Sequence, residues 1–243
     1  MVSYCQTDVG RKRSLNEDFV YASQQSVGPL KNLFIVADGM GGHNAGEIAS
    51  RLAVESMVDH IESAAEGSPI RILDSAVLAA NQAVAEKAGS DKSFAGMGTT
   101  LVACTLEEDC LYLLNVGDSR LYIVGEQIQQ ITRDHSLVEE MVRRGELARS
   151  QAQNHPEKNV ITRAIGARST VRADLFDVTV QEGEIVLLCS DGLTNMVEDE
   201  QILEILQSEP ELETAGRKLI EAANLNGGAD NISVILIRVG SGD

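Results

Sequence analysis

The sequence has few of the residues that commonly shape a fold or divide a chain. Among its 243 residues there is no tryptophan and only 3% are aromatic, so a core must be built mainly from aliphatic side chains. Four prolines and no proline-rich or serine-rich tract leave no obvious boundary between domains. We therefore predict one domain spanning residues 1–243, which is within the range of a single large domain.

Cysteine is also scarce, and the four cysteines form no CxxC pair. The absence of such a pair disfavours a zinc site of that type or a redox motif. Cys104 and Cys189 lie in apolar, strand-like runs, as expected for buried reduced thiols. We interpret all four as free thiols in a reducing compartment, namely Cys5, Cys104, Cys110 and Cys189.

Positive charge is in short supply: 20 lysines and arginines face 37 aspartates and glutamates, for a formal net charge of −17. Nucleic acids and anionic membranes bind clustered cations, so we expect neither as a partner. The chain begins with no signal-peptide pattern, and no apolar run approaches the roughly 18 residues of a membrane span. We predict a soluble, cytoplasmic protein.

Apolar runs bounded by Gly, Asp and Asn predict strands, and apolar spacing of three to four residues predicts helices. Two helices come early in succession, and several strands then follow without helices between them. That order favours antiparallel sheets with helices packed outside, which is an α+β fold. The expected strands are 33–37, 99–106, 111–116, 120–124, 184–189 and 232–239; the expected helices are 46–64, 71–88, 136–147, 199–208 and 212–228.

A polar, charged stretch over residues 135–166 interrupts the run of strands. It has helical spacing near its start and an X-Pro break at His155-Pro156. We interpret it as an inserted helical flap beside an active site. An ordinary surface connection is the alternative.

Four strand-like runs each have an aspartate at one end, with a glycine within four residues. These are Asp38, Asp118, Asp191 and Asp230. Any one of them could form an Asx-turn or a helix N-cap. If the four ends converge, however, the carboxylates need cations to stay ionised. Hard divalent ions prefer oxygen ligands, and the chain has only four histidines and no His-pair motif, so the pattern favours an oxygen-ligand metal site.

In the stretch "VADGMGGHNAGE", residues 36–47, Gly39, Gly41 and Gly42 follow the first of these aspartates within four residues. Gly39 would let a backbone carbonyl approach an ion, because a Cβ there would crowd it. Gly41 and Gly42 would keep the loop open to a bulky substrate.

Seven motifs occur in order: "SLNEDF", "VADGMGGHNAGE", "GMGTTL", "VGDSRLY", "ITRDHSLV", "LLCSDGLTN" and "GGADNISV". Together they resemble the bacterial branch of the metal-dependent serine/threonine protein phosphatases, the PPM or type 2C family. The resemblance runs from about Thr7 to Val239. It implies a four-layer α-β-β-α sandwich, with two antiparallel sheets flanked by helix pairs and a helical flap.

The resemblance also implies roles for individual residues. Asp38 is similar to the carboxylate that bridges two tightly bound manganese or magnesium ions, with the Gly39 carbonyl on the second ion. Asp191 and Asp230 match the other ligands of the first ion. The remaining implied ligands are Glu17 and Asp18, which match the acidic pair that holds the second ion largely through water, and Asp118, which with Asp191 matches the site of a third, weaker ion.

Arg13 aligns with the arginine that grips the substrate phosphate. The "DGMGGH" motif departs from the animal pattern, in which a histidine directly follows Asp-Gly, because Met40 takes that place here. His43 is our candidate for the group that protonates the leaving oxygen; the alternatives are that it only orders the loop or that a metal-bound water is the acid. Two ions about 3.5–4 Å apart would lower the pKa of a bridging water from ~15.7 toward neutrality.

The expected activity is hydrolysis of phosphoserine and phosphothreonine in proteins, reversing a cognate serine/threonine kinase, by a chain that acts as a monomer. A nucleotide-binding protein is one rival, but no GxxxxGK[ST] motif is present. A pseudophosphatase that has lost its metals is another, and the intact Asp38, Gly39, Asp191 and Asp230 argue against it.

Overall fold

The computed structural model describes residues 1–42, 44–152 and 155–240. Within them, every strand pairing is antiparallel, and the strands form two sheets. The first sheet has the order β1-β11-β10-β7-β8, with β1 Val2–Asp8, β11 Ile232–Arg238, β10 Ile185–Cys189, β7 Arg120–Val124 and β8 Ile128–Gln130. The second has the order β2-β3-β5-β6-β9, with β2 Asp18–Ser23, β3 Leu33–Met40, β5 Leu101–Glu107, β6 Cys110–Val116 and β9 Asp174–Thr179, and β4 Gly98–Thr99 pairs with β3.

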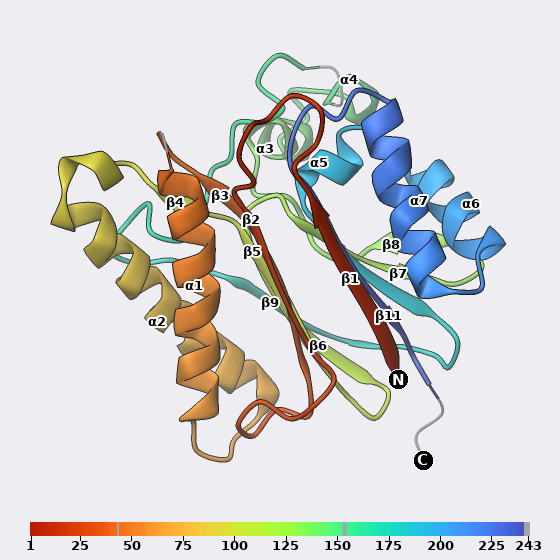
Figure 1. The fold of residues 1–243 in the computed structure, drawn as a ribbon, viewed down its shortest axis with the longest axis horizontal. Helices are drawn as coiled ribbons and strands as arrows, with labels where there is room; N and C mark the ends of the chain where they lie inside the picture. The colour runs from red at the N-terminus through yellow and green to blue at the C-terminus, as the bar shows by residue number, and fades with distance from the viewer. Residues whose placement is uncertain (43, 153–154, 241–243) are drawn as a thin grey trace.

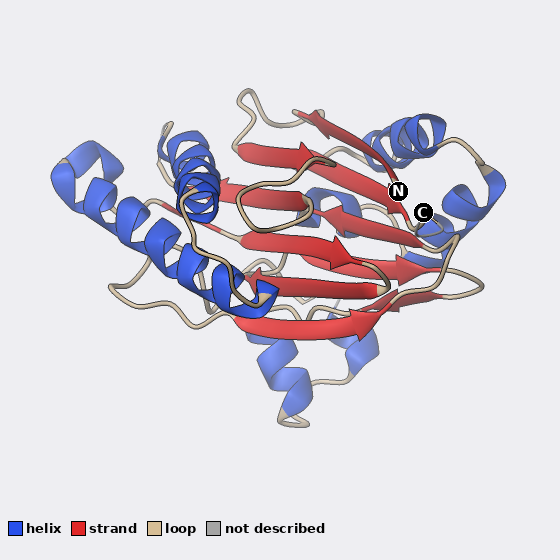
Figure 2. Cartoon of the chain, turned by 90° about the horizontal axis from the view of Figure 1, so that it is seen from below, coloured by secondary structure: helices blue, strands red, loops and turns tan. Residues whose placement is uncertain are grey.

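The two sheets pack face to face, and helices cover both outer faces (Figures 1 and 2). Helices α1 Ala45–Glu62 and α2 Pro69–Ser90 lie against the second sheet, and α6 Asp199–Ser208 and α7 Leu212–Leu225 lie against the first. Short helices occupy the end of the sandwich shown at the top of Figure 1: α3 Leu137–Arg143, α4 Arg149–Ala152 and α5 Asp191–Thr194; a 3-10 turn, η1 Lys92–Phe94, follows α2. The predicted four-layer α-β-β-α sandwich is confirmed.

Three apolar clusters account for the layers. One joins the facing sides of the two sheets through Phe34, Val102, Leu188 and Ile235. A second fills the space between α1, α2 and the second sheet, and a third does the same for α6, α7 and the first sheet. Strands buried on both faces have no polar side to alternate with, which is why they appear in the sequence as continuous aliphatic runs.

The strands and helices with strong apolar patterns were predicted correctly to within a few residues. Strands β1, β2, β8 and β9 were not predicted, because their half-exposed residues break the aliphatic runs. Strand β3 also continues through Asp38 to Met40 instead of stopping at Ala37. Cys104 and Cys189 are buried free thiols, as expected.

Antiparallel pairing gathers the chemistry at one end of the sandwich. Asp18 begins β2 and lies opposite Asp38 near the end of β3. Asp191 directly follows the loop after β10, and Asp230 precedes β11, the antiparallel neighbour of β10. Asp118 lies in the turn after β6. The helices of the segment 135–166 lie at this same end (Figure 1).

Candidate metal centre

The carboxyl groups at this end of the sandwich are close enough to raise one another's pKa values. Burial, and then the charges of Asp18, Asp191 and Asp118, raise the pKa of Asp38 well above its usual value. Burial, and then the charge of Asp191, raise the pKa of Asp118 to about 8. Burial and the nearby Asp230 raise the pKa of Asp191. Such a group cannot be fully ionised without compensating cations.

Asp18 is held by two hydroxyl groups from the other sheet. Its Oδ2 accepts hydrogen bonds from Ser190 Oγ and Ser233 Oγ, both at 2.7 Å. These bonds favour the charged carboxylate, but burial outweighs them and the pKa of Asp18 rises to about 7. Asp18 is therefore tied to β10 and β11 as well as to Asp38, and it links the two sheets at the site.

Three carboxylate oxygens in this cluster are buried and have no hydrogen-bond partner among the described residues: Glu17 Oε1, Asp18 Oδ1 and Asp191 Oδ1. The second oxygen of Asp191 accepts from Asn195 Nδ2 at 2.9 Å. Asp18 and Asp191 thus each have one oxygen fixed by the protein and one oxygen left over, which suits a hard cation.

The donor chemistry fits a divalent ion, but the coordination shell is not preformed. No group of three or more His, Cys, Asp or Glu side chains within the described ranges is already arranged to hold a metal ion. The fit therefore rests on the oxygen donors, their burial and their mutual repulsion. A Cβ on Gly39 would lie 2.1 Å from the Gly46 carbonyl oxygen, so glycine is required there for the packing of β3 against the start of α1.

Glu17 is positioned through its backbone. Its N–H donates to Asn231 Oδ1 at 2.8 Å, and its carbonyl oxygen accepts from Ser50 Oγ at 2.6 Å. A Cβ on Gly46 would lie 2.3 Å from Glu17 Oε1, so the glycine of α1 leaves room for this carboxylate. Burial raises the pKa of Glu17, and Arg13 opposes that rise.

Arg13 is paired with one of the expected metal ligands. Its Nη2 donates to Asp230 Oδ2 at 2.8 Å, and its Nη1 lies 3.7 Å from Glu17 Oε2. The Arg13 side chain is 47% exposed, so it can reach solvent or a ligand outside the cluster. The loop that carries Arg13 is fixed by Asn231, whose Nδ2 donates to the carbonyl oxygens of Val9 and Leu15 at 3.0 and 2.9 Å.

Asp118 is joined to Asp38 through a short chain of hydroxyl groups. Thr100 Oγ1 accepts from the backbone N–H of Asp38 at 3.0 Å and lies 2.7 Å from Ser119 Oγ. Gly117 has φ +109°, and a Cβ there would lie 2.6 Å from Thr100 Cβ. The turn that carries Asp118 therefore has no room to shift toward β5.

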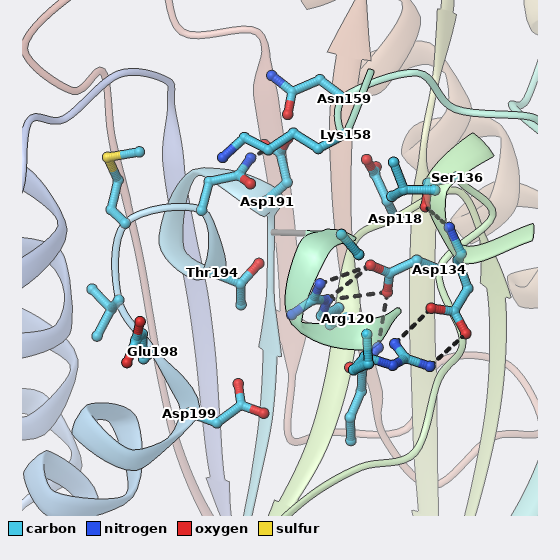
Figure 3. A pocket seen from close by; sticks show the side chains of 18 of the residues that line it. Asp118, Arg120, Asp134, Ser136, Lys158, Asn159, Asp191, Thr194, Glu198 and Asp199 are labelled. Atoms are coloured by element: carbon cyan, nitrogen blue, oxygen red, sulfur yellow. Dashed lines mark hydrogen bonds and ion pairs between the residues drawn. The ribbon is translucent and has the colours of Figure 1, made fainter. Parts of the chain in front are cut away.

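A pocket of about 490 Å³ opens beside the cluster, with Asp118 and Asp191 at its edge (Figure 3). One wall comes from α5 and the start of α6, and the other from the segment 135–166. Lys158 and Asn159 of that segment lie near Asp191 in Figure 3. Other residues of the segment that line the pocket are Ser136, Val138, Glu139, Arg149, Ser150 and Ala152.

The pocket is polar, and several of its charges are paired. Arg149 makes a two-pronged ion pair with Glu139, at 2.6 and 3.0 Å. Arg120 makes another with Asp134, with contacts of 2.8 to 3.1 Å. These forked pairs fix the shape of the pocket where Arg120 and Arg149 line it, because planar guanidinium-carboxylate contacts have a specific geometry.

The predicted site residues Arg13, Glu17, Asp18, Asp38, Gly39, Asp191, Asp230 and Asp118 all lie at one end of the sandwich. His43, the predicted acid, lies outside the described residues. Sequence reasoning missed the residues that support this cluster, which are Thr100, Ser190, Asn231 and Ser233. All four stand inside the quoted motifs "GMGTTL", "LLCSDGLTN" and "GGADNISV", but nothing local in those motifs indicates a partner far away in the chain.

Comparisons with known proteins agree on one family. The sequence profile described as Protein phosphatase 2C matches residues 5–227. The chain is 41% identical over 238 residues to the serine/threonine phosphatase stp of Listeria innocua, covering 95% of this chain and 93% of that protein. It is 37% identical to the protein phosphatase PhpP of Streptococcus pneumoniae, covering 98% of this chain and 97% of that protein.

Solved structures resemble the fold over almost its full length. The Mycobacterium tuberculosis serine/threonine phosphatase PstP/Ppp superposes with a TM-score of 0.90 at 37% identity, covering 98% of each chain. A structure of the PstP catalytic domain in complex with two manganese ions has a TM-score of 0.87 at 36% identity, covering 99% of this chain and 98% of that one.

Proposed function

The chain belongs to the protein phosphatase 2C family, and we propose that its buried carboxylate cluster is the centre at which it hydrolyses phosphoserine and phosphothreonine in proteins. Protein serine/threonine phosphatase activity and dependence on metal follow from that membership. The observation that supports the location of the centre is the group of aspartates with raised pKa values at one end of the sandwich.

The proposed ligands are the residues predicted from the sequence. Asp38 would bridge two ions, Asp191 and Asp230 would complete the site of the first, and the Gly39 carbonyl would join the second. Glu17 and Asp18 would complete the second site, directly or through water. When bound, manganese or magnesium supplies an activated water and offsets negative charge on the phosphate oxygens.

Arg13 would bind the phosphate. A guanidinium presents a planar fork that matches two phosphate oxygens. In this structure the fork is partly used by Asp230, so substrate binding would exchange a carboxylate oxygen for a phosphate oxygen. The exposure of the side chain supports such an exchange.

The pocket beside Asp118 and Asp191 would receive the protein chain that flanks the phosphorylated residue. Its size and its polar walls suit a peptide segment better than a small apolar ligand. One of its two walls belongs to the segment 135–166, which supports the flap interpretation over that of a plain surface connection.

Two finer proposals concern the chemistry. Asp118, with Asp191, would hold a third and weaker ion. His43 would protonate the departing serine or threonine oxygen, and a metal-bound water is the alternative acid.

The remaining proposals concern context. We propose a single catalytic domain over residues 1–243, a cytoplasmic monomer, and a cognate serine/threonine kinase whose products it reverses. No helix within the described residues is both long and apolar enough to cross a membrane. The net charge of −17 supports the absence of nucleic acid among its partners.

The test uses a phosphothreonine peptide and follows released phosphate. Activity should disappear in chelator and return with manganese. Asp38→Asn should abolish turnover and leave the circular dichroism spectrum unchanged, whereas Asp177→Asn, which removes a similar charge from the exposed side of β9, should leave turnover intact. Full activity of metal-free protein, or of the Asp38 variant, would refute the proposal.

A further inference from the structure

His135 lies where the segment 135–166 leaves the first sheet, and it contacts the turn that carries Asp118. Its side chain is only 5% exposed. Its Nδ1 accepts a hydrogen bond from the backbone N–H of Gly117 at 3.1 Å, and its own backbone N–H donates to the Gly117 carbonyl oxygen at 2.9 Å. Both polar groups of the Gly117 backbone are therefore bonded to this one residue.

The opposite edge of the imidazole contacts the other end of the same segment. His135 Nε2 lies 3.1 Å from Asp174 Oδ2, and Arg163 donates to Asp174 Oδ1 at 2.7 Å. Arg163 Nη1 also lies 3.1 Å from His135 Nε2. The His135 carbonyl oxygen accepts from the N–H of Thr162 at 2.7 Å. His135 thus joins the point where the segment begins, the point where it returns and the start of β9.

These contacts assign the tautomer of the ring. The Gly117 N–H can only donate, so Nδ1 of His135 carries no proton. In the neutral ring the proton is then on Nε2, which donates to Asp174. Arg163 Nη1 is itself only a donor, so it bonds to Asp174 Oδ1 and not to the protonated Nε2. The neutral form agrees with the direction of its pKa, which burial lowers.

The turn that His135 holds has little freedom on its other side. Ser119 Oγ lies 2.7 Å from Thr100 Oγ1, which also accepts from the Asp38 N–H. Asn115 Nδ2 approaches the Gly117 carbonyl oxygen at 3.3 Å. Asp118 is therefore placed between the contact of Ser119 with Thr100, which directly precedes β5, and the imidazole of His135.

We propose that His135 is a positioning residue for the phosphatase reaction, because its imidazole holds the Asp118 turn in register with the base of the flap. The inference rests on the proposed function, in which Asp118 is a metal ligand and residues 135–166 form the flap. His135 itself touches neither substrate nor metal. Its effect is to make the position of Asp118 depend on the position of the flap.

Two substitutions separate the two edges of the ring. The amide oxygen of His135→Asn falls near the position of Nδ1, so it can still accept from Gly117 but cannot reach Asp174. The amide of His135→Gln falls near Nε2, so it can still reach Asp174 but leaves the Gly117 N–H without an acceptor. His135→Ala removes both contacts. The control is His60→Asn in the last turn of α1, a half-buried histidine whose Nε2 lies 3.1 Å from Ser75 Oγ of α2.

At fixed manganese, turnover should fall in the order wild type, His135→Asn, and then His135→Gln and His135→Ala. We expect His135→Asn to stay within about threefold of wild type, and His135→Gln to be lower by about tenfold to 100-fold, as a displacement near 1 Å in a catalytic site can cause. The manganese concentration for half-maximal activity should rise in His135→Gln and His135→Ala but not in His135→Asn. Equal loss in Asn and Gln, or an Asn variant no better than Ala, would overturn the proposal, because a histidine that only fills space would be served equally by either amide.

A measurement without metal or substrate completes the test. In chelator, hydrogen exchange of the backbone amides at 117–119 should be slow in wild type and in His135→Asn. It should be at least about tenfold faster in His135→Gln, because that variant lacks an acceptor for the Gly117 N–H. Unchanged exchange in His135→Gln would overturn the proposed link between His135 and the Asp118 turn even if the enzyme is active. Conversely, a wild-type protein that hydrolyses no phosphopeptide but follows this exchange pattern would contradict the proposed function and not the coupling.

Discussion

Replacing Asp18 with asparagine should stabilise the metal-free protein at pH 8, although it removes an expected metal ligand. In the folded chain, burial raises the pKa of Asp18 from 3.8 to about 7. Between these two values the folded protein keeps a proton that the unfolded chain has lost. The free energy of unfolding therefore falls as pH rises through that window, and it levels off above pH 7.

The size of the effect follows from the shift. A rise from 3.8 to about 7, at about 1.4 kcal/mol for each pH unit, gives about 4 kcal/mol as an upper value for this one carboxyl group. Asparagine cannot ionise, and its amide oxygen can still accept from Ser190 and Ser233. We expect Asp18→Asn to be more stable than wild type at pH 8 in chelator by up to about 4 kcal/mol, and to be similar to wild type near pH 4.

The assay is urea unfolding in chelator, followed by circular dichroism at several values between pH 4 and pH 8. Asp177→Asn, on the exposed side of β9, is the control for removal of one negative charge. When manganese is present, wild type should be more stable than Asp18→Asn, because the variant has lost a ligand oxygen. A metal-free wild type that is as stable at pH 8 as at pH 5, or an Asp18 variant with the same pH dependence as wild type, would refute the reasoning.

Three further outcomes are expected. Arg13→Ala should raise KM for phosphopeptides about tenfold or more without weakening manganese binding, because alanine removes a competitor for Asp230; an unchanged KM in peptide titrations would exclude phosphate contact by Arg13. Asp118→Asn should keep the fold and the two tight ions but lose most turnover, with calorimetric manganese titration showing one weak site fewer; unfolding would instead indicate a capping role. Replacing Arg149 or Lys158 with an uncharged residue should alter the preference among phosphoproteins more than it alters hydrolysis of a small aryl phosphate. Equal effects on both kinds of substrate would contradict the flap interpretation.

The sequence was informative wherever a side chain's role depends on its near neighbours. The aliphatic runs that predicted β5, β6, β10 and β11 are continuous because those strands are buried on both faces. Strands β2 and β9 were missed because one edge of each is open and their residues are only partly buried.

The residues of the candidate site also differ in how far the sequence could identify them. Asp38 was identifiable because an aspartate beside glycines interrupts an apolar run, a strong local contrast. Ser190 and Ser233 have no such contrast, yet they hold Asp18 from 172 and 215 residues away along the chain. His135 stands in the quoted motif "ITRDHSLV", but its position there does not reveal its contacts with Gly117 and Asp174, which are 18 and 39 residues away along the chain.

The sequence by itself determined the building blocks: aliphatic strands for two sheets, helices for their outer faces, and an oxygen-rich set of ligands with too few histidines and cysteines for a softer metal. Only the tertiary structure decided that Asp18, Asp38, Asp118, Asp191 and Asp230 share one end of the sandwich, and that Arg13 pairs with the last of them. Strand pairing and register are long-range properties, so the direction in which each strand runs becomes known only when its neighbours are in place. The raised pKa values follow from the same cause, because burial and mutual repulsion exist only once those strands have met.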